Sequence, residues 1–570
     1  MDAPPHRSKA RAGRSRNLAL TAIATLAVLG ADGDSAAAEP SALPAALPLW
    51  PALNADTGKV SAGQALAVAA KTLTVRCVVP DGSRGCPSSE ALAWYERRVR
   101  EDGSSAAGAE ARNRSVVSSV TVDVAAAERS GMGVRTDESY ALSCASARAG
   151  GECKVSANST VGAVRGLETL AHLAHAQHIP LPLQLFDEPR FPYRGLLIDS
   201  ARHFLSVGSV KRILDAMSMT KLSVLHWHLS DTTSFPVQSE AFPQLSQLGA
   251  FHPLLVYTKA NLTDIVAYAA QRGVRIVPEF DLPGHSSFPK SMPHLVIPCA
   301  GALDPTLDAT YSFLRTFLKE MTEEIFPDPY LALGGDEVGY SCAAEVKKGW
   351  LAAHNMTAVE LLPYFWQRVS AEVMPALNRT LYVWGTTHLQ NLDPSITPEG
   401  SVFNLYTALD ASLNVTAKRG VPGVLSAPYY LDQTMSYRGN AHYSPQSYRH
   451  CGTDVHQIDA AWMCFYSTSP TWGVLDAALA WNRSLVLGGE ACIWGEATSE
   501  DSIETQSLTY ASAAAERFWT GNTVPQAAAE QRLAFAEAGG RLGQFVCLLN
   551  RQGLRASPVS PGFCLRGARD

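Results

Sequence analysis

The sequence predicts an α/β protein in which a (β/α)8 barrel follows a smaller α+β domain. Three observations support this prediction: short apolar runs recur eight times between residues 194 and 496, segments with helical spacing separate them, and acidic or aromatic residues follow many of the runs. Barrels of this kind carry their active sites at the carboxyl ends of the strands. The third observation therefore also indicates where the chemistry is expected.

Eight segments are expected to form the parallel barrel strands, because each is a short apolar run bounded by turn-forming or polar residues. They are 195–199, 223–231, 275–281, 330–337, 381–384, 401–406, 423–430 and 485–496. Between them, apolar residues recur at helical spacing. The clearest helical sets are Val210, Ile213, Leu214 and Met217; Ile265, Val266 and Ala269; Leu314, Phe317, Leu318 and Met321; and Leu361, Phe365 and Val369. We place the barrel at residues 191–570.

The first 38 residues read as a signal peptide. Basic residues between Arg7 and Arg16 precede an apolar stretch at 18–29, and three alanines at 36–38 offer a cleavage site. The alternative is an uncleaved membrane anchor, but about 12 apolar residues fall short of the ~20 that span a bilayer. No later segment is long and apolar enough to cross a membrane.

Residues 39–190 are expected to form the separate N-terminal α+β domain. Segments 119–124 and 139–142 have the pattern of strands, and 161–175 has the pattern of a helix. This region carries no cluster of reactive side chains, so we expect it to pack against the barrel and support it.

Two features favour the secretory pathway, and hence a lysosomal, vacuolar or extracellular location. The first is a set of seven Asn-x-Ser/Thr sites, at Asn113, Asn158, Asn261, Asn355, Asn378, Asn414 and Asn482. The second is eleven cysteines, whose spacing is typical of short disulfide loops. The close pairs are 77/86, 144/153, 451/464 and 547/564; pairing of Cys299 with Cys342 would leave Cys492 as a buried thiol.

The charge balance excludes one large class of partner. With a formal net charge of −6 and no dense basic segment beyond the N-terminus, the chain offers no surface for nucleic acid.

The run at 330–337 is the most informative stretch, because an apolar strand stops at two glycines and is followed by Asp336 and Glu337. Two adjacent carboxylates can differ in pKa, so that one holds a proton while the other stays charged. Acid-assisted bond cleavage needs this division of labour. The alternative is a solvated turn with an incidental acidic pair.

Acids, an arginine and aromatic residues at the other strand ends suit a sugar. Aromatic faces pack on the apolar faces of sugar rings, and charged groups bind the hydroxyls. The competing interpretation is a metal site, because His226 and His228 resemble the histidine pair with which some barrel hydrolases hold zinc. Strands five and six lack the further histidines of that arrangement, so we expect no metal and no cofactor.

Six ordered motifs resemble the β-N-acetylhexosaminidases of glycoside hydrolase family 20, particularly the lysosomal type. They lie at 189–203, 225–231, 279–285, 333–338, 425–432 and 488–496, and the segments 137–140 and 166–169 resemble markers of that family's N-terminal domain. The resemblance implies a retaining exo-enzyme that removes terminal GlcNAc or GalNAc. In such enzymes the substrate's own acetamido oxygen replaces a protein nucleophile.

The resemblance also implies roles for individual residues. Glu337 would be the acid and base on the glycosidic oxygen, for which a raised pKa would suit it, and Asp336 would orient the acetamido group. Tyr430 would donate to the acetamido oxygen. Asp231 and His285 would form a relay that tunes Glu337, although His285 could instead be a structural histidine. In the sugar-binding pocket, Arg194 and Glu496 would bind ring hydroxyls, and Trp384 and Trp494 would form walls.

Two positions bear on specificity. Where the family usually has a tryptophan at the end of strand six, this chain has Leu405 followed by Tyr406, which is able to substitute. Asp432 resembles the acid that binds the 6-hydroxyl in forms acting on neutral substrates, and its carboxylate would repel a 6-sulfate. The expected partner is therefore a glycan with an uncharged terminal N-acetylhexosamine.

Two questions stay open at the level of sequence. A catalytically silent sugar-binding protein on the same barrel is the rival function, and the presence of both Asp336 and Glu337 argues against it. The resemblance allows a homodimer, but no segment of the chain identifies an interface.

Overall fold

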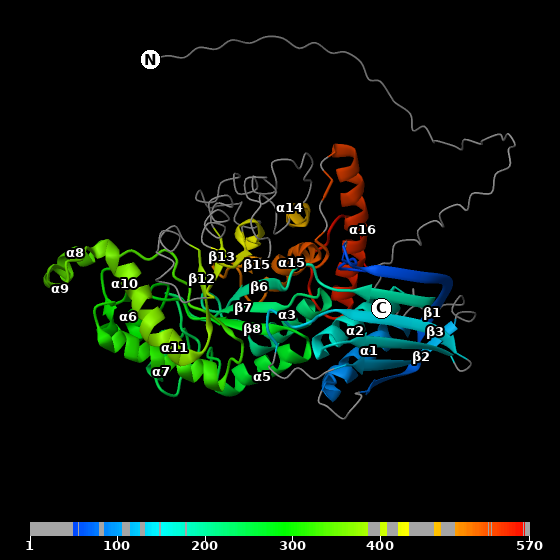
Figure 1. Cartoon of the computed structure of the whole chain (residues 1–570), viewed down its shortest axis with the longest axis horizontal. Helices are drawn as coiled ribbons and strands as arrows, with labels where there is room; N and C mark the ends of the chain where they lie inside the picture. Colours follow the sequence, from blue (N-terminus) through cyan, green and yellow to red (C-terminus); the bar gives the residue numbers. More distant parts are fainter. Residues whose placement is uncertain are drawn as a thin grey trace, which may run out of the picture. The chain divides into compact units, whose positions relative to one another are not determined.

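Eight parallel strands form the closed barrel that the sequence predicts (Figure 1). Its order is β11-β12-β13-β14-β15-β6-β7-β8, so β6 pairs with β15 to close the ring. The strands are β6 (Tyr193–Asp199), β7 (Val224–His228), β8 (Arg275–Glu279), β11 (Tyr330–Ala332), β12 (Thr380–Trp384), β13 (Val402–Leu405), β14 (Gly423–Leu425) and β15 (Val486–Ile493). All eight predicted runs contain a strand, and most of the observed strands are shorter than the run.

The computed structural model describes residues 49–54, 56–78, 85–104, 115–125, 132–147, 150–176, 179–385, 400–406, 420–432, 461–468, 485–521, 524–525, 527–562 and 564. The predicted signal peptide lies outside these residues. No helix in these ranges is long and apolar enough to cross a membrane.

Helices follow the strands, as their spacing predicts. The four predicted helical sets lie in α3 (Val207–Met219), α5 (Lys259–Gln271), α7 (Asp308–Glu324) and α10 (Leu361–Arg368), the last of which continues as the π-helical turn η4 (Val369–Val373). The other helical elements of the barrel region are α4 (Gln244–Gly249), α6 (Phe288–Ser291), η2 (Pro293–Leu295), α8 (Ala343–Val346), α9 (Lys348–Ala353), η3 (Ala358–Glu360), α11 (Met374–Leu377), η6 (Ala427–Tyr429), α14 (Ala461–Ser467), α15 (Ile503–Thr520) and α16 (Ala528–Arg551). A two-stranded sheet pairs β9 (Val296–Ile297) with β10 (Ala302–Leu303).

The barrel interior changes character along its length. One buried cluster takes a residue from each of seven strands, namely Tyr193, Val224, Val277, Ala332, Tyr382, Val402 and Val424. Two residues further along β7 and β8, the buried side chains are His226 and Glu279. Because side chains alternate along a strand, these polar residues lie on the same face as the apolar layer. The barrel is therefore packed by apolar side chains at one level and by ionisable groups at the next.

The N-terminal region folds as an α+β module, which agrees with the prediction. Its strands are β1 (Lys59–Val78), β2 (Ser115–Val124), β3 (Tyr140–Ala147), β4 (Gly150–Ala157) and β5 (Ile179–Asp187), joined in the order β1-β2-β4-β3-β5 with β5 pairing back onto β1. Two helices, α1 (Ser89–Ser104) and α2 (Thr160–His175), complete it. The side chain of Ser159 caps α2 by accepting from the amide of Gly162, and most of this helix is buried.

Asp187 ties the module to the barrel region. Its carboxylate accepts from the amide of Asn54 at 2.9 Å, from Tyr140 Oη at 3.0 Å, from Trp519 Nε1 at 2.9 Å and from Lys221 Nζ at 3.3 Å. Trp519 belongs to α15 and Lys221 follows α3, so one carboxylate connects four distant segments.

Four of the expected cysteine pairs form disulfides. They are Cys77–Cys86, Cys144–Cys153, Cys299–Cys342 and Cys547–Cys564. Cys464 is also disulfide-bonded, while its expected partner, Cys451, lies outside the described residues. Cys492 is a free, buried thiol, as predicted.

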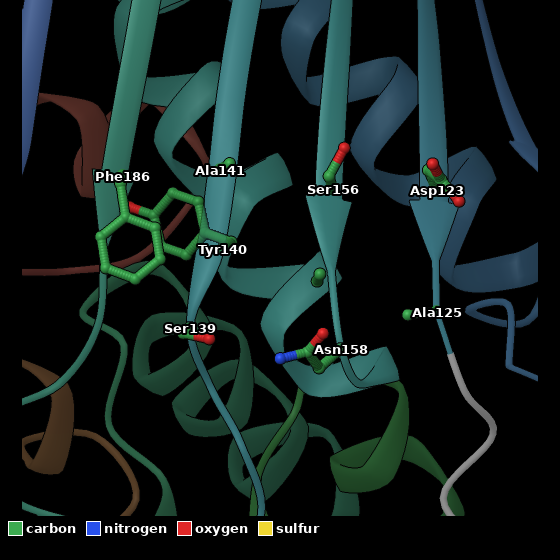
Figure 2. A pocket seen from close by; sticks show the side chains of 9 residues that line it. Asp123, Ala125, Ser139, Tyr140, Ala141, Ser156, Asn158 and Phe186 are labelled. Atoms are coloured by element: carbon green, nitrogen blue, oxygen red, sulfur yellow. The ribbon is translucent and has the colours of Figure 1, made fainter.

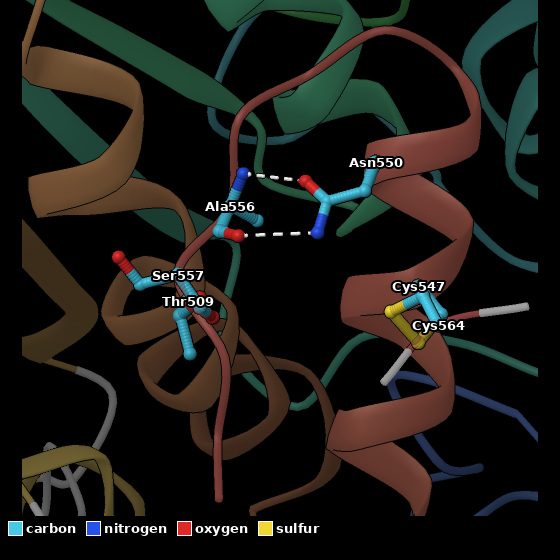
Figure 3. Close-up of a disulfide and its surroundings, with 6 residues drawn as sticks. All are labelled: Thr509, Cys547, Asn550, Ala556, Ser557 and Cys564. Atoms are coloured by element: carbon cyan, nitrogen blue, oxygen red, sulfur yellow. Dashed lines mark hydrogen bonds between the residues drawn. A yellow bond between two sulfur atoms is a disulfide. The ribbon is translucent and has the colours of Figure 1, made fainter. Parts of the chain in front are cut away.

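One disulfide and three hydrogen bonds hold the segment that follows α16 (Figure 3). Cys564 is bonded to Cys547 in α16, and Asn550 of the same helix exchanges two hydrogen bonds with the backbone of Ala556. Thr509 of α15 donates to the carbonyl of Ser557 at 2.5 Å.

Candidate active site

The two adjacent acids lie in a turn directly after β11. The strand ends at Ala332, and Gly334 and Gly335 take φ values of +63° and +103°. A Cβ on Gly334 would stand 1.8 Å from Oδ1 of Asp281, and the amide of Gly335 donates to that same oxygen at 3.2 Å. Glycine is required here because another residue would collide with Asp281 and would resist the left-handed conformation. After these glycines the two acids differ in exposure, since Asp336 is half-buried and Glu337 is exposed.

Asp336 is the less exposed member of the pair, half-buried as a residue. Burial raises its pKa, the carboxylate of Glu279 adds to that effect, and the positive charge of His285 opposes it. Its Oδ1 is buried, and no donor among the described residues reaches this atom. A buried acceptor without a donor is costly in a folded protein, so Oδ1 is suited to receive an N–H from a bound molecule.

Glu337 is the exposed member, with 70% of its side chain accessible. Its φ of +53° is unusual for a residue with a side chain, and such backbone conformations cluster at functional sites. Its Oε2 lies 3.4 Å from His285 Nε2, and Nδ1 of the same ring lies 3.2 Å from Oδ2 of Asp231. The relay expected from sequence is therefore present as a geometric arrangement.

Asp231 is the most heavily bonded member of this relay. Its Oδ2 also meets His228 Nε2 at 3.2 Å and Arg202 Nη2 at 2.9 Å. Hydrogen bonds from His228 and His285, together with the charges of His228 and Arg202, outweigh its burial and hold the pKa of Asp231 well below its usual range.

Aromatic side chains form one wall of the site. Trp384 at the end of β12 and Trp494 after β15 have ring centres 5.5 Å apart, and Tyr430 lies 6.4 Å from Trp494. Tyr406 packs edge-on against Trp384 at 5.4 Å, and the acids Asp336 and Glu337 add to the burial that raises its pKa. Leu405 lies instead in the main apolar core. At the end of strand six the residue that joins the aromatic cluster is therefore Tyr406, the substitute suggested by the sequence.

The prediction for Arg194 is wrong. This residue is fully buried near the start of β6, where it donates to Glu138 at 2.5 Å and to the carbonyls of Lys221 and Phe191. Active-site residues of such a barrel lie beyond the other end of the strand. Arg194 is a structural residue that joins the N-terminal module to the barrel.

Arg202 occupies the place that we assigned to Arg194. It follows the carboxyl end of β6, bonds to Asp199 at 2.9 Å and to Asp231 at 2.9 Å, and approaches Glu496 at 3.4 Å. Its guanidinium also lies 5.1 Å from the ring centre of Trp494. Its position after the strand, in the same motif as Arg194, was the feature of the sequence that could have identified it.

Asp432 and Glu496 stand near each other at the mouth. Burial and the charge of Glu496 raise the pKa of Asp432 to about 7, against the opposing charge of Arg202. Glu496 is exposed, with 57% of its side chain accessible. These acids and Arg202 offer charged hydrogen-bonding groups to a polar ligand.

Below the mouth, ionisable groups fill the barrel. His226 lies 3.0 Å from Glu490 and 3.2 Å from Glu279, and His228 lies 2.8 Å from Glu279. Glu279 also accepts from Trp384 Nε1 at 2.6 Å, which connects the buried charges to the aromatic wall.

His228, Glu279 and Asp281 are close enough together to bind a metal ion. A histidine must be neutral to coordinate a metal. Although burial alone would lower the pKa of His228, the nearby Glu279 and the hydrogen bond to Asp231 raise it to about 10. The imidazole is therefore protonated at neutral pH and bonded at both nitrogens, so this donor set does not fit a metal.

A second hollow lies on the sheet of the N-terminal module (Figure 2). Side chains from β2, β3, β4 and β5 line it, including Asp123, Tyr140, Ser156 and Phe186. Asp123 is its one lining acid and pairs with Lys154 at 2.8 Å. The hollow does not combine an acid pair with aromatic walls, as the barrel mouth does.

Comparison with known proteins gives matches over both regions. Residues 191–522 match the model of the glycosyl hydrolase family 20 catalytic domain, and residues 83–173 match a β-acetyl hexosaminidase-like domain. The β-hexosaminidase subunit beta of Mus musculus is 34% identical over 427 residues, which cover 72% of this chain and 73% of the relative. The subunit beta of Homo sapiens is 33% identical over 451 residues, covering 76% and 74%.

The fold is shared with solved structures. A mutant Streptomyces plicatus β-hexosaminidase, solved in complex with the product GlcNAc, superposes with a TM-score of 0.63 at 22% identity. The match covers 92% of this chain and 99% of that chain.

Proposed function

This chain belongs to glycosyl hydrolase family 20, and from that membership we propose that it is a retaining exo-β-N-acetylhexosaminidase. Its substrates are glycoconjugates that end in an uncharged GlcNAc or GalNAc. The relatives named above are called β-hexosaminidases, and the alignments cover about three quarters of their length. This supports the proposed activity.

The reaction uses the substrate's own amide. In this family the 2-acetamido oxygen attacks the anomeric carbon while the glycosidic C–O bond breaks, and an oxazolinium-like ring forms. Glu337 gives its proton to the leaving oxygen. Water then attacks the same carbon, Glu337 takes back a proton, and the ring opens to restore the acetamido group with the original configuration.

The observation that carries this proposal is the contrast between the two adjacent acids. Glu337 is exposed and within reach of His285, while Oδ1 of Asp336 is buried without a donor among the described residues. Asp336 accepts the acetamido N–H and aligns the oxygen for attack. As positive charge develops on the amide nitrogen, the carboxylate of Asp336 stabilises it more in the transition state than in the ground state.

The surrounding side chains hold the sugar. Trp384, Trp494 and Tyr406 enclose the acetamido group and the ring, and Tyr430 donates to the acetamido oxygen. Arg202 and Glu496 bind ring hydroxyls through charge-assisted hydrogen bonds, and the carboxyl group of Asp432 is a further partner for a hydroxyl.

The protein acts in the secretory pathway, within a lysosome or vacuole or outside the cell. Four described disulfides support an oxidising route, and four Asn-x-Ser/Thr sites, at Asn158, Asn261, Asn355 and Asn378, lie wholly or partly exposed. We retain 1–38 as the signal peptide, 39–190 as the N-terminal domain and 191–570 as the barrel domain. A homodimer is also retained as a proposal.

Hydrolysis of p-nitrophenyl β-N-acetylglucosaminide between pH 4 and pH 7 tests the function. We expect release of p-nitrophenol with retention of the anomeric configuration. NMR of the first-formed sugar product measures that configuration. Asp336→Asn should lower kcat by roughly 10²- to 10³-fold while KM changes little, because the variant loses the charge that stabilises ring closure. Binding of GlcNAc without any turnover by the unmutated protein would leave a sugar-binding protein in place of the enzyme.

A further inference from the structure

The groups that lead away from Glu337 do not stop at Asp231. Successive distances are 3.4 Å from Glu337 to His285, 3.2 Å to Asp231, 3.2 Å to His228, 2.8 Å to Glu279, 3.2 Å to His226 and 3.0 Å to Glu490. Carboxylate and imidazole alternate at every step. We call these seven residues the acid–imidazole file.

The acid–imidazole file runs from the exposed end of the barrel into its buried interior. The exposed fraction of the side chain falls from 70% at Glu337 to 22% at His285 and 4% at Asp231. From His228 onward each member exposes 1% of its side chain or less. The deep members come from three strands, namely β7, β8 and β15, so the rigid barrel fixes their positions.

Burying the charges of this file costs free energy unless every charge is paired. Burying a lone charge costs several kcal/mol, and the cost is recovered only when each ion has a well-placed partner. Here each buried imidazole lies between two carboxylates. The deep end is anchored further, because Glu490 accepts from Tyr193 Oη at 2.6 Å and from Asn404 Nδ2 at 2.7 Å.

Resting on the proposed glycosidase function, we propose that the relay behind Glu337 extends through Asp231 to His228, which is a positioning residue for the catalytic acid. The positive imidazole ring of His228 holds Asp231 in its charged form and in one orientation. Asp231 in turn fixes the ring of His285, and that ring presents Nε2 to Glu337. The barrel interior therefore contributes to the proton affinity of a residue at the mouth.

The charged groups around each link are consistent with this assignment. His228 faces Glu279 from β8, Asp231 from the segment after β7 and Asp199 from the end of β6. His285 faces Asp231, Glu337, Asp336 and Arg202. Glu337 contacts His285, and its charge also acts on Tyr406.

The sign of the expected pH effect follows from charge alone. A positive charge disfavours the protonated form of a neighbouring group. Removing that charge therefore raises the neighbour's pKa. The alkaline limb of kcat/KM reports the acid that must hold its proton, which is Glu337 in this mechanism. Loss of the His228 charge should therefore move that limb to higher pH.

Two neutral replacements separate charge from position. His228→Gln can still present an N–H toward Asp231, whereas His228→Asn is too short and presents its N–H toward Glu279. Both should move the alkaline limb upward by about half to one pH unit. His228→Asn should also lower kcat by roughly 10²-fold, and His228→Gln by less than about tenfold, because only the glutamine still anchors Asp231.

Two further variants complete the experiment. His226→Asn removes a charge further along the file and should move the limb in the same direction by a smaller amount. His172→Gln is the control for the loss of any buried histidine, because His172 is buried 2.9 Å from a glutamate in the N-terminal module, away from the file, and burial lowers its pKa. Its alkaline limb should stay in place even if its melting temperature falls.

The outcomes distinguish the inference from the function beneath it. Absence of hydrolysis by the unmutated protein overturns the function, and the inference with it. With normal hydrolysis, an unmoved limb in both His228 variants, or a shift matched by His172→Gln, overturns the inference alone. If the His228 variants do not fold, the limb of His226→Asn decides: an upward shift supports the file, and an unmoved limb overturns it.

Discussion

At the scale of single residues, the division of labour that we propose for Asp336 and Glu337 follows from where each side chain lies. The segment after β11 leaves Glu337 exposed beside His285 and leaves Asp336 half-buried, with its Oδ1 inaccessible to solvent. Exposure lets a carboxyl group exchange protons with substrate and water, and burial makes a carboxylate more effective at stabilising a nearby positive charge.

Glu337→Gln tests the acid and base role. The amide cannot transfer a proton, so kcat should fall by about 10²- to 10⁴-fold on an unactivated glycoside. Added azide should restore little activity, because the acetamido group remains the nucleophile. Glu345→Gln, which changes an exposed acid in the following helix α8, is the control and should leave kcat unaltered. Strong azide rescue with formation of a glycosyl azide would contradict a substrate-borne nucleophile.

From the position of Asp432 we predict that the preference for neutral over 6-sulfated substrates depends on pH. Because burial raises its pKa to about 7, the group is largely neutral at pH 5 and charged at pH 8. Repulsion of a 6-sulfate is therefore weak at low pH and grows as the pH rises through 7. The ratio of kcat/KM for neutral over 6-sulfated GlcNAc should increase by roughly tenfold across this interval. Asp432→Asn should give a ratio that is flat with pH; a pH-dependent ratio in that variant would assign the effect to another group.

The sequence motifs name candidate residues that lie together in the structure, but Arg194 was misplaced and the choice between Leu405 and Tyr406 was left open, for a shared physical reason. A motif gives residue types in order, but it does not say which end of the strand each one occupies. Arg194 precedes the buried strand and faces the N-terminal module, while Arg202 follows the strand and reaches the mouth. Similarly, Leu405 and Tyr406 are neighbours whose side chains take opposite sides, and only contacts identify Tyr406 as the wall.

At the scale of elements, the strands were predictable because a parallel strand covered on both faces must be apolar along its length. The stretch after Ala332 was not predictable in the same way. Although β11 ends at Ala332, backbone hydrogen bonds to the neighbouring segments continue through Leu333 and Gly334. The chain then diverges at two glycines, the first of which lies within contact distance of Asp281. That long-range contact has no signature in local sequence.

Gly334→Ala measures how tightly this turn is constrained. The added Cβ would stand 1.8 Å from Asp281 Oδ1, on a residue whose φ is +63°. We expect a loss of about 2–4 kcal/mol in stability, together with a large loss of kcat as Asp336 and Glu337 are displaced. Gly339→Ala is the matched control in the same loop, since no atom lies within 4 Å of its added Cβ. Equal melting temperatures and activities in the two variants would show that the turn is not constrained.

At the scale of the whole molecule, buried charges join the N-terminal module to the barrel. Glu138 of the module bonds to Arg194 and Arg165, and Arg165 in turn donates to the carbonyl of Gly273 at 2.8 Å. Both ends of these bonds are nearly inaccessible to solvent, so a substitution that removes one partner leaves the other as a buried, unpaired charge. Packing of this module against the barrel was predictable; the residues that carry it were not, because the partners lie far apart in sequence.

Asp187→Ala tests this coupling. The change leaves Lys221 as a buried cation without its carboxylate partner, and burial already lowers the pKa of that lysine. We expect a stability loss of about 3–5 kcal/mol, seen as a lower melting temperature in calorimetry. KM measured at low temperature should change little, because no member of the catalytic pair contacts Asp187.

The control for this variant is Asp123→Ala in the same module. Asp123 pairs with Lys154 where the two side chains are 35% and 50% exposed. A surface pair of this kind contributes up to about 1 kcal/mol, so the melting temperature should stay close to that of the unmutated protein. Similar melting temperatures for the two variants would show that Asp187 does not couple the module to the barrel.

The hydrogen bond from Trp384 to Glu279 has a consequence for redesign of the pocket. In the pocket that we propose, Trp384 is the side chain to shorten if bulkier N-acyl groups are to be admitted, since we assign its indole to the wall. A shorter side chain would also remove the indole N–H that donates to Oε1 of Glu279 at 2.6 Å. Enlarging the cavity and preserving the buried ions are therefore a single design problem, and a replacement must supply a new N–H or O–H as well as more room.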